Sequence, residues 1–113
     1  MNKFLIVVSS FFLLSSMDCS AAVYKGQKEY VKKCVICHHA GQEFIATKKK
    51  REWASLMRNG GEALAQIHIE SKNRKAEPSV EYFQSDDFAS SAKHLKDFMK
   101  EYAQDSGNVP ACN

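Results

Sequence analysis

Two cysteines and a histidine stand within five consecutive residues, Cys34-Val35-Ile36-Cys37-His38, and no other feature of the 113-residue chain restricts its local structure as strongly. Thiols three positions apart lie on one turn, so both can bond to the same small group. The histidine that follows is aimed at that group by the attachment of its neighbours. The spacing therefore predicts a turn whose side chains converge on a single chemical partner.

Several chemistries use cysteines at this spacing. C-x-x-C-H is the attachment pattern for haem c, in which each thiol adds to one vinyl group of a single porphyrin and His38 binds the iron. A structural disulfide is one alternative. A thioredoxin-like redox pair needs strands that the sequence does not indicate, and a zinc site of Cys34, Cys37, His38 and His39 would crowd its ligands into six residues. We expect one covalently bound haem c.

The first 22 residues have the order of a secretory signal peptide. Lys3 gives a basic start, an apolar run extends from Phe4 to Leu14, and small residues follow at 20–22. As a helix the apolar run would span only about half of the roughly 30 Å hydrocarbon core. We therefore expect cleavage, a periplasmic location without stable membrane insertion, and a mature domain of residues 23–113.

Apolar residues at helical spacing predict an all-α fold of about four helices, and no segment has a strand pattern. Residues 35–50 are expected to form a loop that wraps around the bound group, and residues 71–86 are expected to form the longest connection, with a short turn near residues 80–83. Ser90 or Ser91 is expected to cap the last helix. The other predicted helices cover residues 23–33, 50–58 and 62–70.

The series Gly26-x-x-x-Tyr30-x-x-x-Cys34-x-x-Cys37-His38, with Leu95, Phe98 and Tyr102 in a C-terminal helix, resembles the class I cytochrome c family. The resemblance implies helices wrapped around one haem, with the first and last helices crossing where Gly26 packs against Phe98 or Tyr102. It also implies a carrier of single electrons between larger redox proteins. The segment from Asp105 to Pro110 is similar to short cytochromes of epsilonproteobacteria.

The sixth iron ligand is where the sequence departs from this family, which usually supplies a methionine from a loop before the last helix. No methionine lies between residues 60 and 91, so His68, Met57 and Met99 are the candidates. Methionines on helices are commonly core residues, and we favour His68, which shares a predicted face with Leu64 and Ile67. A second histidine would lower the reduction potential relative to methionine. An open position would instead indicate a gas-binding or sensor protein.

The remaining features indicate neither an enzyme nor a nucleic-acid partner. The carboxylates form no catalytic spacing, and a formal net charge of +3 is too small to indicate nucleic acid. The basic run 48–51 either steers the protein toward an acidic redox partner or is a solvated loop. A cytochrome subunit of a dehydrogenase would need the same domain. His39 and His94 are expected at the surface, and Cys112 is a free thiol, an iron ligand or half of a disulfide.

Overall fold

All regular elements in the described part of the chain, residues 20–109 of a computed structural model, are helical. This confirms the predicted all-α class. Residues 1–19 and 110–113 lie outside the described residues, and so do Cys19, Cys112 and most of the predicted signal peptide. The α-helices are α1 (Ala21–Lys33), α2 (Val35–His38), α3 (Gly41–Phe44), α4 (Lys50–Leu56), α5 (Arg58–Ile69), α6 (Val80–Phe83) and α7 (Asp86–Glu101), and the 3-10 helices are η1 (Ile45–Thr47) and η2 (Arg74–Ser79).

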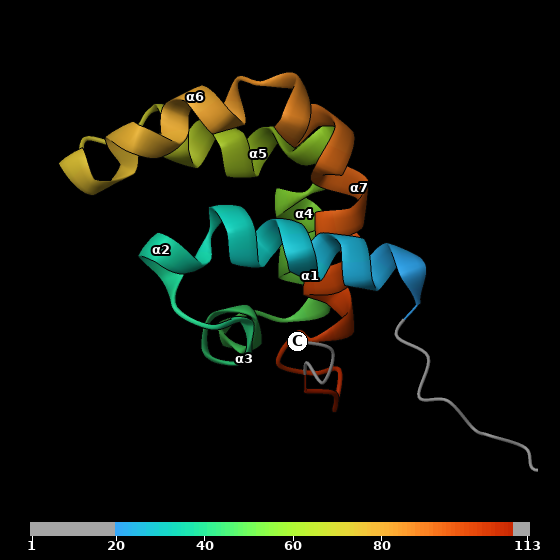
Figure 1. Ribbon diagram of the computed structural model, residues 1–113. Coiled ribbons are helices and arrows are strands. Elements are labelled where there is room, and N and C mark those ends of the chain that lie inside the picture. Colours follow the sequence, from blue (N-terminus) through green and yellow to red (C-terminus); the bar gives the residue numbers. More distant parts are fainter. Residues whose placement is uncertain (1–19, 110–113) are drawn as a thin grey trace, which may run out of the picture.

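The first and last long helices, α1 and α7, cross in close contact (Figure 1). A Cβ atom built on Gly26 would overlap the backbone carbonyl of His94 and lie 2.7 Å from Phe98 Cβ. The crossing therefore requires glycine at this point. The predicted contact between Gly26 and Phe98 is confirmed.

Around this crossing lies a core of aromatic and aliphatic side chains. Its largest fully buried members are Trp53, Tyr30, Phe98, Ile45 and Leu95. The indole nitrogen of Trp53 donates a hydrogen bond of 2.8 Å to the carbonyl of Ile45, so the one polar atom of this large ring is satisfied. The core thus connects α1, α4 and α7 with the turn η1.

On the other side of the molecule, α5 and α6 lie together and face the layer formed by α1 and α2 (Figure 1). Asn59, Gly60 and Gly61 have φ angles of 53°, 70° and 80°, which separate α4 from the regular part of α5. This agrees with the predicted helix end at residues 59–61. No helix among residues 20–109 is long and apolar enough to span a membrane.

The last helix begins earlier than predicted. The N-cap is Ser85 rather than Ser90 or Ser91, and its hydroxyl accepts a hydrogen bond of 3.3 Å from the amide of Phe88. The acidic Asp86 and Asp87 occupy the first turn, where the helix dipole favours negative charge. The extra turn buries Phe88 in the core.

Two further expectations were wrong in part. Residues 35–50 were expected to be a loop but contain α2, α3 and η1, each too short to produce a period in the sequence. Ile67 does not share a buried face with His68, because 57% of its surface is exposed. The residues of α5 that pack against the core are Leu64, Ala65 and Ile69.

We predict that Gly26→Ala lowers the free energy of unfolding by about 1–3 kcal/mol, because the added methyl group forces α1 away from α7. Chemical denaturation measures this loss. Lys25→Ala, an exposed change on the same helix, is the control and should unfold like the wild type. Equal stability of the two variants would contradict the close approach of α1 to α7.

Candidate cofactor site

The C-x-x-C-H motif lies where α1 ends and α2 begins. Cys34 caps the end of α1, with its amide bonded to the carbonyl of Tyr30 at 2.8 Å. The amides of Cys37 and His38 both bond to the carbonyl of Cys34, at 3.1 and 2.9 Å. The motif is therefore a hydrogen-bonded turn, as its spacing predicts. Cys34 is partly buried, Cys37 is exposed, and both are free thiols.

The Tyr30 side chain stabilises this turn by hydrogen bonding to its backbone. Its hydroxyl donates a hydrogen bond of 2.7 Å to the carbonyl of His39 and lies 3.3 Å from that of His38. Burial raises the pKa of Tyr30, and the neighbouring Cys34 raises it further. The hydroxyl therefore keeps its proton at neutral pH and remains a donor. His39, with a φ of 53°, turns the chain away after the motif.

The imidazole rings of His38 and His68 meet between the two layers. Their centres are 6.0 Å apart and their planes are inclined at 79°. His38 comes from α2 and His68 from α5, so the fold brings together the two histidines that the sequence singled out. This pair is the centre of the candidate site.

A hydrogen bond holds the ring of His68, and burial affects the charge of His38. His68 Nδ1 lies 2.8 Å from the carbonyl oxygen of Leu64. A carbonyl only accepts, so Nδ1 carries the hydrogen and the lone pair is on Nε2. Burial lowers the pKa of His38, and His68 and His39 lower it further. The His38 ring is therefore neutral at pH 7, which is the form that binds metals.

An aromatic ring stacks on each of the two histidines. Phe44 stacks on His38 with centres 4.2 Å apart, and Phe44 also contacts Trp53 at 5.7 Å. Phe83 stacks on His68 at 4.1 Å and contacts Phe88 at 4.8 Å. Both imidazoles are thus held by apolar side chains that limit the access of water.

These residues supply the groups that would hold a haem, namely two thiols for attachment and two imidazole nitrogens for its iron. Histidine nitrogen is a common ligand of haem iron, and the ring centres of His38 and His68 are 6.0 Å apart. Cys34 and Cys37 lie on the same turn as His38, as thioether attachment requires.

The alternative chemistries of the motif find less support. In residues 20–109, no group of three or more histidine, cysteine, aspartate and glutamate side chains is arranged to hold a metal ion. Redox-active C-x-x-C motifs depend on a cysteine with a lowered pKa. Here burial, followed by the charges of Glu29 and Cys37, raises the pKa of Cys34 to about 12. Cys34 is a poor nucleophile for thiol exchange.

The other candidate ligands lie in the core. Met57 and Met99 are each only 3% exposed. A Cβ atom built on Gly61 would lie 3.3 Å from Met57 Cε and 2.6 Å from Phe88, which places the Met57 methyl group beside α7. These two methionines therefore pack as helical methionines usually do.

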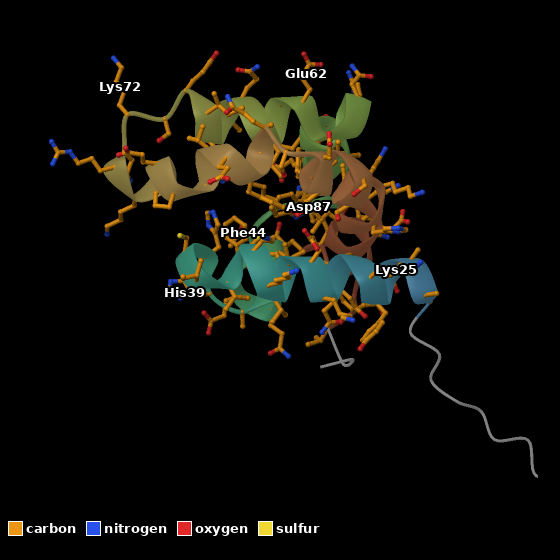
Figure 2. All side chains as sticks on the ribbon, turned by 45° about the horizontal axis from the view of Figure 1, so that its top comes forward. Lys25, His39, Phe44, Glu62, Lys72 and Asp87 are labelled. Carbon is orange, nitrogen blue, oxygen red and sulfur yellow. The ribbon has the colours of Figure 1, made fainter. Side chains whose placement is uncertain are left out.

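His39 is exposed beside the motif, as expected (Figure 2). The expectation for His94 was wrong, because this residue is half-buried against α1 and its Nδ1 atom is buried without a hydrogen-bond partner among the described residues. In the basic run 48–51, Lys50 and Arg51 begin α4 and Lys49 is its N-cap. The amide of Lys50 donates to the carboxylate of Asp105 at 2.8 Å, which ties this run to the end of the chain.

No protein family model, no curated protein and no solved structure matches this chain. The site therefore has to be judged on its own geometry. Sequence reasoning missed Phe44, Phe83, Tyr82 and Glu29 as parts of it. The only available signal was the short apolar turn at residues 80–83, whose role depends on contacts with distant elements.

We predict that maleimide labels Cys37 at least about tenfold faster than Cys34 in the haem-free chain at neutral pH, because Cys37 is exposed whereas Cys34 is partly buried and its pKa is raised. Peptide mapping of a Cys112→Ser protein measures both rates. In urea the two rates should converge. Faster labelling of Cys34 would show instead the activated thiol of a redox motif.

Proposed function

We propose that this protein is a class I type cytochrome c that carries one haem c and transfers single electrons between redox proteins in the periplasm. Cys34 and Cys37 would hold the haem through thioether bonds, and His38 and His68 would bind the iron from its two sides. The observation that carries this proposal is the meeting of the His38 and His68 rings at 6.0 Å, across 30 positions of sequence.

The haem supplies a reversible one-electron change at its iron. The chain supplies binding, orientation and exclusion of water. Tyr30 holds the backbone of the motif, and the carbonyl of Leu64 holds the tautomer of His68. Because both ligands would be imidazole nitrogens, we expect a lower reduction potential than with a methionine ligand.

No described residue besides these needs to act on a substrate, which suits a carrier. Transfer between proteins requires only that the cofactor edge approaches the surface. The exposed Cys37 and Ile36, the latter 88% exposed, mark the side of the motif that a partner can reach. An electron-transfer partner would therefore dock over α2.

Covalent attachment is tested by producing the mature protein together with a haem-attachment system. We expect one haem that stays bound after denaturation, seen as added mass and as haem staining in a denaturing gel. The double variant Cys34→Ala, Cys37→Ala should lose all covalent haem, whereas Cys112→Ser should keep it. A wild-type protein without covalent haem would refute the proposal.

The sixth ligand is tested by substitution of His68. We expect a low-spin absorption spectrum for the wild type and a high-spin spectrum for His68→Ala, because the iron loses one strong ligand. His68→Met should raise the reduction potential. Met57→Leu and Met99→Leu, which change core residues of similar volume, are the controls and should stay low-spin. A high-spin wild type would favour the gas-binding or sensor alternative.

A further inference from the structure

A hydrogen bond joins the two layers beside the candidate site. The Tyr82 hydroxyl on α6 donates to the Glu29 carboxylate on α1 at 2.7 Å, across 53 positions of sequence. The Lys33 ammonium group, one helical turn after Glu29, lies 5.2 Å from the centre of the Tyr82 ring. Two charged side chains of α1 therefore hold one tyrosine of α6.

Tyr82 is connected to His68 through the next residue of α6. Phe83 follows Tyr82 in α6, and its ring stacks on His68 at 4.1 Å with planes inclined at 26°. Phe88, at the start of α7, contacts both Tyr82 at 5.6 Å and Phe83 at 4.8 Å. The position of His68 thus depends on α6, and that of α6 depends on α1 and α7.

The segment that carries His68 has few other attachments to α1. We call α5, η2 and α6, residues 58–83, the arm. Most of η2 is exposed, and Figure 2 shows Lys72 at the end of the arm with its side chain directed away from α1. Leu64, Ala65 and Ile69 of the arm pack against the core. The attachment of the arm to α1, the helix that leads into the motif, is a separate contact.

Tyr82 is suited to provide that attachment. Burial raises the pKa of Tyr82, and the hydrogen bond to Glu29 raises it further. The hydroxyl therefore stays protonated and keeps donating at neutral pH. A hydrogen bond to a charged acceptor is stronger than one between neutral groups.

We propose that Tyr82, with Glu29 and Lys33, forms a latch that holds the arm closed, so that His68 faces His38, and that release of this latch opens a binding position for a small diatomic ligand. The effect on the iron rests on the proposed function, but the closing of the arm does not. Tyr82 is a positioning residue, which acts on His68 through Phe83. The same fold can then be a carrier when closed and a ligand-binding protein when open.

The test uses the haem-loaded mature protein and carbon monoxide as the probe. Tyr82→Phe removes the hydroxyl and keeps the ring, so we expect carbon monoxide to bind the reduced protein about 10- to 100-fold faster than it binds the wild type. Glu29→Leu should have the same effect. Glu29→Gln retains an oxygen that accepts the hydrogen bond, so carbon monoxide should bind this variant as slowly as it binds the wild type. Tyr24→Phe, on an exposed tyrosine of α1, is the matched control and should leave the rate unchanged.

Amide hydrogen exchange of residues 74–83 gives a readout that does not depend on the iron. It can be measured with or without haem, and Tyr82→Phe should accelerate exchange in α6 without accelerating it in α7. Unchanged exchange in this variant would overturn the latch. Faster exchange with unchanged carbon monoxide binding would overturn its effect on the iron and count against His68 as ligand. Absence of haem in the wild type would refute the proposed function. Hydrogen exchange in the Tyr82→Phe variant would still test the latch in that case.

Discussion

The close crossing of α1 and α7 at Gly26 is the contact on which the rest of the structure depends. Because no side chain separates the helices there, α1 lies against the backbone of α7 and buries Tyr30. The Tyr30 hydroxyl then reaches the carbonyls of His38 and His39 at the end of the C-x-x-C-H motif. One missing Cβ atom therefore sets the position of a turn two helical turns further along α1.

Two groups of aromatic rings form the surroundings of the two histidines. On the side of α1, Phe44 and Trp53 support His38, and on the side of the arm, Phe83 and Phe88 support His68. Each group stacks on its own histidine, and both belong to the same core. The distance between the histidines is set by how the two layers are joined, which is why a single tyrosine between them can control the site.

Local features of the sequence predicted the local structure well. The helix before the motif, the turn at the motif and the glycine interruption at residues 59–61 were all expected, since each follows from neighbouring residues. The start of α7 was misjudged because Ser85, Ser90 and Ser91 are all acceptable caps, and only the burial of Phe88 selects the first. His94 was misjudged because its burial depends on α1, a helix far away in the sequence.

The sequence by itself determined the chemistry available to this protein: two thiols and a histidine on one turn, and a second histidine on an amphipathic helix. Such short-range patterns follow from the geometry of single turns and helices. Only the tertiary structure decided that His68 rather than Met57 or Met99 meets His38, and that Tyr82 joins the arm to α1. These pairs are separated by 30 or more positions, and their distances result from the packing of whole helices, which no local pattern specifies.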